Sequence, residues 1–502
     1  MTDIWQSLLL GFQVALRPEN LGLAFAGALI GTIVGVLPGI GPVGGIAILL
    51  PLTFRLPPSS AMIMLTAVYY GTMYGGSTTS ILMNVPGEAS SVVTAFDGYA
   101  MAQQGRAGPA LAISAVGSFI AGTLSIIGLT FFSPLLADWG IRFGPPEYFA
   151  LMLFGLSAVS SLAGDSLVKA LMSMGFGLML ATVGTDLVTG VPRYTFGIPY
   201  LLDGIDFVVV VIGLFAISEV LISVEEARGE VRVPVKLERI WLSMRDFTQS
   251  FWAIIRGSVI GFYIGILPAA GATIASFLSY SVEKQVAKDP STFGKGDIRG
   301  VASPESANNA AAVGNMIPML TLGIPGSSTT ALMMGALLVL NVVPGPTLFT
   351  KHPDIVWGLV ASMYVSNFML LVLNLPLVGL FVRILYVPER ILLPLIIAVC
   401  VIGTYAVNFS PFDLLVMAAI GLIAYAMRKQ DYPLGPAILG LVLGDLMEQN
   451  LRRSLIMSRG SAVIFFTRPV SAVFIALSIL SLLAPYLLRV VRRPAVSATI
   501  ES

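Results

Sequence analysis

Residues 27–41 are GALIGTIVGVLPGIG, and residues 257–271 are GSVIGFYIGILPAAG. Four glycines and one proline recur between these stretches at an offset of 230: Gly27, Gly31, Gly35, Pro38 and Gly41 match Gly257, Gly261, Gly265, Pro268 and Gly271. The 502 residues include 51 glycines and 31 prolines, so this match at one offset is improbable by chance. Paired apolar segments interrupted by glycine and proline are typical of the binding site of a secondary transporter.

The composition is that of a membrane protein. Hydrophobic residues make up 56% of the chain and charged residues 11%, whereas soluble domains are about 25% charged. The mean hydropathy is +0.89. Several stretches contain or approach the ~20 apolar residues that cross a bilayer: 106–135, 145–164, 206–223, 354–382 and 461–488. The sequence therefore predicts an all-α polytopic protein whose main partner is the lipid bilayer.

Several classes of function are excluded by what the sequence lacks. A net charge of +1 argues against a nucleic-acid partner. The single cysteine, Cys400, and the single histidine, His352, rule out a disulfide framework and argue against a metal site. We find no Gly-x-Ser-x-Gly elbow, phosphate loop or His-Glu-x-x-His motif. We therefore expect a protein that is not an enzyme, has no cofactor and does not hydrolyse ATP.

The two halves of the chain resemble each other at further places. Pro86-Gly87 matches Pro325-Gly326 at an offset of 239, and Pro146-Glu147 matches Pro388-Glu389 at 242. We predict a first membrane repeat over 1–225, a second over 251–490 and a tail over 491–502. The polar connector, 226–250, would contain an amphipathic helix in the membrane interface, with its apolar face formed by Leu237, Ile240, Trp241, Met244, Phe247 and Phe251.

Each copy of the opening pattern has arms that are short for a crossing of ~30 Å. Basic residues flank the outer ends, Arg17 and Arg55 in the first copy and Arg245 and Lys284 in the second. Such flanks favour a re-entrant hairpin that enters and leaves on one face, although one long kinked helix is the alternative. We predict two inverted repeats with re-entrant, Gly/Pro-broken helical hairpins, in an elevator-type transporter.

A second pair of breaks follows the hairpins. Ser303 is a predicted N-cap, with Pro304 at the first helical position of a helix that runs to about Leu322. Gly323-Ile324-Pro325-Gly326 ends that helix, because proline lacks the N–H and glycine tolerates positive φ. The first half has a similar break at Asn84-Val85-Pro86-Gly87. We call 84–88 the first break and 323–327 the second break, each counted to the residue that follows Pro-Gly.

Helix N-termini at such breaks favour anions, and the freed carbonyls of the preceding helix favour cations. No Lys or Arg occurs in 21–54 or 303–350, so we expect dipoles and hydroxyls to hold an anion. The predicted substrate-binding residues are Pro38, Gly39, Gly41, Ser77, Thr78, Thr79, Asn84, Pro86, Gly87, Pro268, Gly271, Thr273, Asn308, Asn309, Gly323, Pro325, Gly326, Ser327 and Ser328. The candidates for holding a coupling ion, Na⁺ or H⁺, are Glu305, Asn308, Asn315 and Thr321. Interhelical hydrogen bonding is the alternative role for both Asn308 and Asn309.

Several motifs resemble the large membrane subunit of tripartite tricarboxylate transporters (TctA-like). They are GVLPGIGP at 35–42, NVPGE at 84–88, DGYAMA at 97–102, PESANNA at 304–310 and LGIPGS at 322–327. The resemblance covers about residues 20–450. It implies a permease of the bacterial inner membrane, driven by an ion gradient, that takes up tricarboxylates or related carboxylates. It also implies two partners, a small membrane subunit (TctB-like) and a periplasmic substrate-binding protein (TctC-like).

Other functions stay open at this point. An anion-selective channel would usually show a pore-lining motif, and none is evident. A receptor-independent secondary carboxylate carrier would have the same helix breaks. An intramembrane enzyme would need a catalytic dyad, whereas the scattered aspartates lie mostly near the ends of apolar runs.

Overall fold

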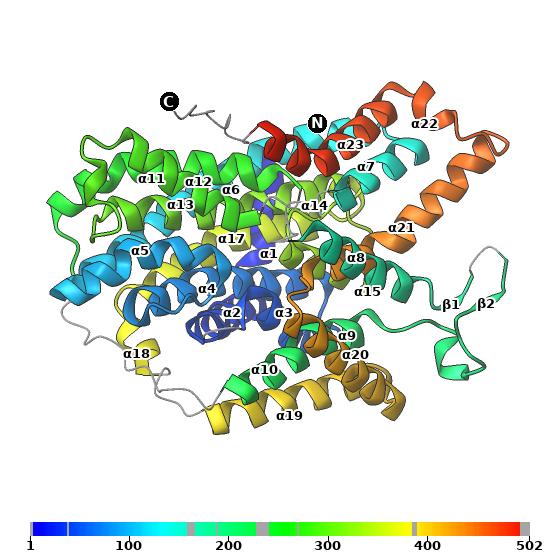
Figure 1. The fold of residues 1–502 in the computed structure, drawn as a ribbon, viewed down its shortest axis with the longest axis horizontal. Coiled ribbons are helices and arrows are strands. Elements are labelled where there is room, and N and C mark those ends of the chain that lie inside the picture. Colours follow the sequence, from blue (N-terminus) through cyan, green and yellow to red (C-terminus); the bar gives the residue numbers. More distant parts are fainter. Residues whose placement is uncertain are drawn as a thin grey trace, which may run out of the picture.

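The computed structural model describes residues 4–37, 40–157, 166–186, 189–226, 240–268, 271–383 and 389–491. Most of these residues lie in helices (Figure 1). The described part of the chain has one small sheet, in which β1 (Gly184–Thr185) pairs antiparallel with β2 (Pro192–Arg193). Five helical stretches are long and apolar enough to cross a membrane: Pro18–Val36, Ala89–Gly140, Phe207–Glu225, Pro353–Asn374 and Pro411–Lys429. The prediction of an all-α membrane protein is confirmed.

The first half begins with a helical hairpin and a long buried helix. The hairpin arms α2 and α3 pack against each other and against α4, which is buried along nearly its whole length. Helix α5 follows the first break and leads through a π-helical segment into α6. The elements are α1 (Ile4–Ala15), α2 (Pro18–Val36), α3 (Gly41–Thr53), α4 (Pro58–Met83), η1 (Ala89–Ser91), α5 (Val92–Met101), η2 (Ala102–Arg106) and α6 (Ala107–Gly140).

The second half repeats this order of elements. The hairpin arms α11 and α12 pack against each other and against the buried helix α13. Helix α15 follows the second break, and the long helix α17 comes after it. The elements are α11 (Met244–Ile266), α12 (Gly271–Val286), η6 (Pro290–Thr292), α13 (Arg299–Gly314), α14 (Met316–Leu322), α15 (Ser328–Val339), α16 (Leu348–Lys351), α17 (Pro353–Asn374) and α18 (Val378–Val382).

Equivalent glycines make equivalent contacts in the two halves. A Cβ at Gly31 would lie 2.4 Å from the Val68 carbonyl oxygen, and a Cβ at Gly261 would lie 2.3 Å from that of Ala307. One turn further along, a Cβ at either Gly35 or Gly265 would lie 2.5 Å from a carbonyl oxygen, of Thr72 or Ala311. Val68 and Thr72 are 239 residues before Ala307 and Ala311. The sequence repeat is therefore also a repeat in helix packing, in which backbone approaches backbone through glycine.

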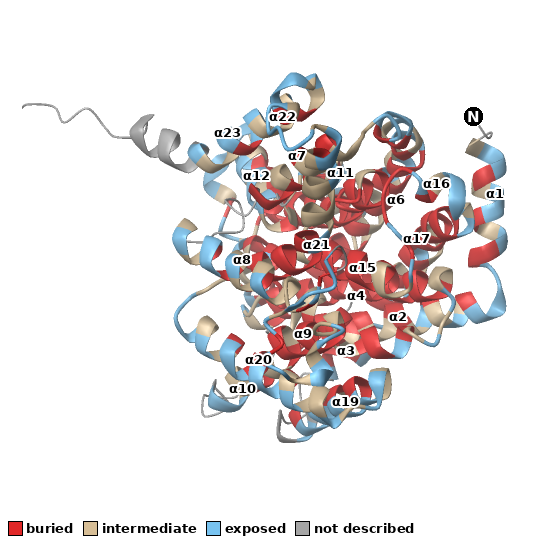
Figure 2. Cartoon of the chain, turned by 90° about the vertical axis from the view of Figure 1, so that its right-hand side faces the viewer, coloured by how far each residue is buried: buried red, intermediate tan, exposed pale blue. Residues whose placement is uncertain are grey.

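The buried helices of the two halves run antiparallel. Ser77, near the end of α4, contacts Glu305 near the start of α13, whereas Tyr69, earlier in α4, contacts Asn315 at the end of α13. In Figure 2 the buried residues are concentrated in central helices such as α4 and α15, and exposed residues lie mainly on the peripheral helices. Many exposed side chains are large and apolar, among them Leu135, Trp139 and Leu415. Such surfaces are suited to contact with lipid.

The remaining helices of the two halves pack against each other. Helices α7 and α8 of the first half pack against α21, and α19 and α20 of the second half pack against η5. In Figure 1, α7 lies at the upper right, α8 and α21 lie to the right of the centre, and α19 and α20 lie at the bottom. They are α7 (Pro145–Ser157), α8 (Leu167–Ala181), η4 (Pro199–Leu201), α9 (Phe207–Val211), η5 (Ile212–Ile217), α10 (Ser218–Glu226), α19 (Glu389–Asn408), α20 (Pro411–Lys429), α21 (Gly435–Met457), α22 (Ile464–Thr467) and α23 (Pro469–Val491).

Two details differ from the sequence-based expectations. Ser303 is not an N-cap, because α13 begins at Arg299 and contains Pro304, and the helix is divided at Asn315 instead of running unbroken to Leu322. Pro304 is the sixth residue of α13 and has no N–H to donate to the Gly300 carbonyl, so the helix continues through it with one backbone hydrogen bond fewer.

The connector also differs from expectation. Ser243 caps α11 by accepting a hydrogen bond from the Asp246 N–H at 3.0 Å, so Met244 belongs to the 23-residue helix of the hairpin arm and not to a separate helix. Trp241 precedes that helix, and Leu237 lies outside the described residues. The expectation of short arms is wrong for the first arm of each hairpin, because α2 is long and apolar enough to cross a membrane and the 23 residues of α11 extend about 35 Å at 1.5 Å per residue. The return arms α3 and α12 are shorter, with 13 and 16 residues, and the re-entrant topology stays a prediction.

Candidate carboxylate site at the two helix breaks

The two breaks have the same backbone construction. Helix α4 ends at Asn84 with φ 54° and ψ 32°, and α14 ends at Gly323 with φ 69° and ψ 32°. Four residues later, Glu88 and Ser327 are N-caps in extended conformation, and both form a capping box with the third residue of the next helix. That third residue is Ser91 or Thr330. All these pairs are 239 residues apart, so the break belongs to the repeat.

Glycine at each break allows close contact with the long buried helix of its own half. A Cβ at Gly87 would lie 2.4 Å from the Gly35 carbonyl oxygen and 2.5 Å from the Gly76 Cα. A Cβ at Gly326 would lie 2.8 Å from the Asn315 Cα. Gly76 and Asn315 are again equivalent positions. The loops therefore lie against α4 and α13 with no room for a side chain.

The first break contains a carboxylate. Glu88 is buried, and its Oε1 accepts a hydrogen bond of 2.7 Å from Nδ2 of Asn308 on α13. Asn308 is fully buried, and its Oδ1 has no hydrogen-bond partner among the described residues. A Cβ at Gly76 would lie 3.0 Å from the Glu88 Cγ. The long Glu88 side chain thus fits where α4 has no side chain.

The second break has neutral groups at the equivalent positions. Ser327 is at the position equivalent to Glu88, and its hydroxyl interacts with the Tyr69 hydroxyl. Tyr69, on α4, is the equivalent of Asn308 on α13. Nδ2 of Asn315 donates to the Tyr69 hydroxyl oxygen at 3.3 Å, whereas its Oδ1 has no partner in the described part of the chain. Each break therefore contacts the buried helix of the opposite half.

Glu305 is held by hydroxyl groups from three helices. Its Oε2 accepts hydrogen bonds from Ser77 of α4 at 2.5 Å and from Ser114 of α6 at 3.0 Å, and its Oε1 accepts one from Thr94 of α5. Glu305 is fully buried. Hydroxyl donors stabilise a buried carboxylate, so this cluster connects α13 to the first half. On the next turn, Asn309 donates to the Ser118 hydroxyl at 2.7 Å.

The other predicted site residues have more varied positions. Thr78, Thr79 and Pro325 are buried, whereas Asn84 is exposed. Thr321 donates to the Ile317 carbonyl of its own helix at 2.7 Å. Gly41 and Gly271 begin α3 and α12 with φ of 60° and 66°. Pro86, Pro268, Thr273 and Ser328 are half-buried, and Pro38 and Gly39 lie outside the described residues.

Several polar residues of this region were not among the sequence predictions. Glu88 directly follows Pro86-Gly87 in an apolar chain, and an ionisable group there is a signal that could have identified it. Tyr69, Thr94 and Ser114 lie inside helices whose pattern does not distinguish them from packing residues. Their role depends on which helices meet, which the sequence alone does not indicate.

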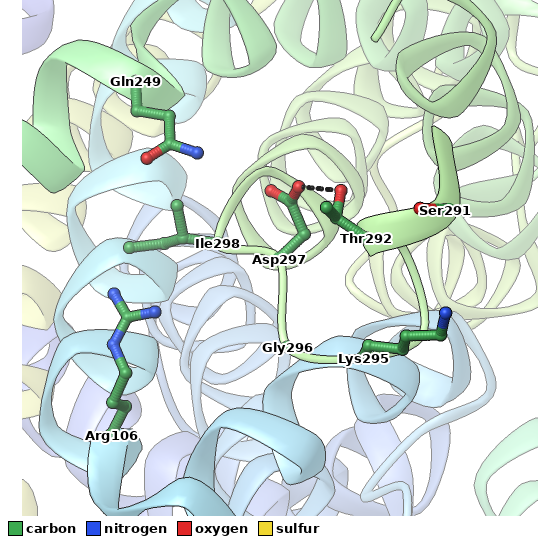
Figure 3. A pocket seen from close by; sticks show the side chains of 8 residues that line it. All are labelled: Arg106, Gln249, Ser291, Thr292, Lys295, Gly296, Asp297 and Ile298. Carbon is green, nitrogen blue, oxygen red and sulfur yellow. Dashed lines mark hydrogen bonds between the residues drawn. The ribbon is translucent and has the colours of Figure 1, made fainter. Parts of the chain in front are cut away.

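A further buried carboxylate joins the two halves away from the breaks. Asp97 of α5 is fully buried, and its Oδ1 accepts hydrogen bonds from the N–H groups of Gly294, Gly296 and Asp297 at 2.8–2.9 Å. Its Oδ2 accepts one from the Tyr280 hydroxyl at 2.9 Å. This loop borders a cavity of about 360 Å³. Figure 3 shows Arg106 across that cavity from Asp297, with Thr292 hydrogen-bonded to Asp297. None of the predicted site residues lines it.

Comparison with known proteins identifies the family of this chain. An Agrobacterium vitis protein described as "Uncharacterized 52.8 kDa protein in TAR-I ttuC' 3'region" is 47% identical to this chain over 480 residues, which are 95% of each chain. A second protein of that organism, "Uncharacterized protein in TAR-II ttuC' 3'region", is 46% identical over 219 residues, which are 44% of this chain and 90% of the relative. No solved structure matches. The family model described as "Tripartite tricarboxylate transporter TctA family" matches residues 21–439, and the chain therefore belongs to that family.

Proposed function

We propose that this chain is the large permease subunit of a tripartite transporter that imports tricarboxylates or related carboxylates across the bacterial inner membrane. An ion gradient, of Na⁺ or H⁺, would drive the import, and no cofactor would be needed. The observation that supports this most is the pair of equivalent helix breaks, which meet buried polar groups of the opposite half. Paired discontinuous helices at a repeat interface are the usual construction of a secondary-transport site.

The chemistry of the second break suits a carboxylate substrate. Ser327 and Thr330 cap the N-terminus of α15, a helix end that favours negative charge. Ser327 and Ser328 are only half-buried, so an anion could reach their hydroxyls after a small movement. Nearby Asn315 and Tyr69 are neutral. The predicted substrate-binding residues around this break, Gly323, Pro325, Gly326, Ser327 and Ser328, would supply backbone N–H groups and hydroxyls.

An inverted arrangement of the repeats would give this site access to both sides of the membrane. Its support is the antiparallel course of the equivalent helices α4 and α13. We propose that the two hairpins and the helices at the breaks move as one elevator-type unit. The outer helices, which pair across the two halves, would form the scaffold.

The partners follow from membership of the family. We propose a TctB-like small membrane subunit and a TctC-like periplasmic substrate-binding protein. The longest polar stretch of this sequence, 225–246, is too short to form a domain that captures substrate. Specificity would then depend partly on the receptor.

Reconstitution tests this proposal. Proteoliposomes that contain this chain and its small membrane partner should take up radiolabelled tricarboxylate only when the receptor and an inward ion gradient are both supplied. The uptake should saturate with substrate. Robust uptake without the receptor would contradict the tripartite assignment and favour a receptor-independent carrier. Flux that does not saturate and needs no gradient would indicate a channel.

A further inference from the structure

The pair formed by Glu88 and Asn308 has one oxygen that the protein leaves without a donor. Asn308 Nδ2 donates to Glu88 Oε1, while Oδ1 of the same amide is buried and has no partner among the described residues. An ionised carboxylate only accepts hydrogen bonds, so Glu88 in that state cannot satisfy Asn308 Oδ1. A buried acceptor without a donor is costly. Because Oδ1 and Nδ2 belong to one amide, this unpaired acceptor lies beside the Glu88 carboxylate, and two neighbouring acceptors are suited to a bound cation.

No positive side chain balances the two buried carboxylates. None of the salt bridges within the described residues includes Glu88 or Glu305. Glu305 accepts hydrogen bonds from three hydroxyls, and two ionised carboxylates in one buried region repel each other. A cation beside Glu88 would reduce that repulsion. Neither carboxylate has a cationic partner in those salt bridges, and the unpaired Asn308 Oδ1 places the candidate cation site at Glu88.

The end of α2 offers further oxygen ligands. Gly35 lies in the last turn of α2, where the final carbonyls lack donors within the helix. Its carbonyl oxygen faces Gly87, the residue before Glu88. Carboxylate, amide and carbonyl oxygens are the ligands that hard cations prefer, and carbonyls at the ends of broken helices hold Na⁺ in transporters.

The second break provides an internal comparison. At the positions equivalent to Glu88 and Asn308 it has Ser327 and Tyr69, neither of which is charged at neutral pH. The negative charge is thus confined to one of two breaks with the same backbone. A carboxylate substrate would be repelled at the first break, and a cation would find no charged ligand at the second.

We propose that the first break is a Na⁺ site formed by the Glu88 carboxylate and Asn308 Oδ1, with a carbonyl from the last turn of α2. The inference rests on the proposed function, because it assigns the coupling ion of that transporter to named residues. In this proposal Glu305 holds α13 against the helices of the first half and does not bind the ion.

Thermal unfolding of the purified full-length subunit in detergent tests the site directly. The unfolding midpoint should rise saturably with Na⁺, at constant ionic strength against K⁺ or choline, because a ligand that binds only the folded state stabilises it. E88Q and N308A should each weaken the apparent Na⁺ affinity roughly ten- to a hundred-fold, which is the effect of losing an interaction with a charged group.

The chain offers matched controls. E147Q changes a buried carboxylate that pairs with Arg468, and N374A removes a buried amide whose Oδ1 also lacks a partner among the described residues. Both variants should keep the Na⁺ response of the wild type. A wild-type midpoint that does not distinguish Na⁺ from K⁺ overturns the proposal, whether or not the variants fold. A response that E88Q and N308A both retain also overturns it.

Carboxylate uptake is measured separately, so the two proposals can fail separately. Uptake driven by a proton gradient, without a specific response to Na⁺, overturns the sodium site and supports the transporter. A Na⁺ response that E88Q and N308A abolish, in a subunit that shows no uptake in the complete system, supports the site and contradicts the transport function.

Discussion

The first break and the second break have one backbone in common and differ in their polar side chains. Both begin with a left-handed residue, Asn84 or Gly323, and both end in a capping box. The first break has Glu88 facing an amide, and the second has Ser327 facing a phenol. The repeat therefore preserves the backbone geometry that interrupts the helices, while the charge at that interruption has diverged.

A compensating difference on the long helices accompanies this divergence. In the first half the large Glu88 lies against Gly76 of α4. In the second half the equivalent positions hold the small Ser327 and the larger Asn315. The side chain that fills the space comes from the break in one half and from the helix in the other. Packing volume is thus similar in the two halves, although the charge is not.

The largest effect should come from filling the space at either break. G87V and G326V should both abolish uptake, because the added Cβ would lie within 2.8 Å of backbone atoms in each case. Overpacking of this kind also costs about 1–3 kcal/mol of stability. Uptake by proteoliposomes and thermal unfolding are the measurements. The control is G22A, because a Cβ at Gly22 meets nothing within 4 Å. Normal uptake by G326V would show that the second break is not part of the site.

A smaller effect should follow from transferring the charge between the breaks. S327E should destabilise the protein and stop uptake, since Asn315 occupies the space that Glu88 uses in the first half. The double variant S327E/N315G should recover part of the lost stability, because it reproduces the combination of Glu88 and Gly76. Unfolding midpoints of the two variants test this. A double variant that is no more stable than S327E would contradict the equivalence of the two breaks.

The sequence predicted the breaks and the repeat because their causes are local. Gly27, Gly31 and Gly35 are spaced four residues apart and allow close helix contact, and Pro86-Gly87 prevents the helix from continuing because proline lacks the N–H. Such features depend on backbone conformation, which neighbouring residues largely determine. The family resemblance, which used the same motifs, is confirmed by the family model.

The polar contacts across the two halves could not be predicted in this way. The ligands of Glu305 come from Ser77, Thr94 and Ser114 on three different helices, and no spacing in the sequence relates them. The start of α13 was misplaced for a related reason. Ser303-Pro304 resembles a helix start locally, but the helix extends back to Arg299.

The smallest effect should come from removing one donor to Glu305. S77A should lower the free energy of unfolding by about 0.5–1.5 kcal/mol, because Glu305 Oε2 loses one hydrogen-bond donor and keeps Ser114. The matched control is S125A, which removes a buried hydroxyl that has no partner among the described residues and should change stability by less than about 0.5 kcal/mol. Chemical unfolding in detergent compares the two. Equal losses for S77A and S125A would mean that the hydroxyl cluster does not stabilise the contact between the halves.

Sided cysteine labelling tests the central claim, that the breaks belong to two inverted hairpin units. Cys400 is the only cysteine, so C400A provides a cysteine-free background for single cysteines at Arg17, Arg55, Arg245 and Lys284. We predict that positions 17 and 55 react with an impermeant reagent from one side of the membrane, and positions 245 and 284 from the other. Reaction of all four positions from the same side, or of the two members of one pair from opposite sides, would contradict the account.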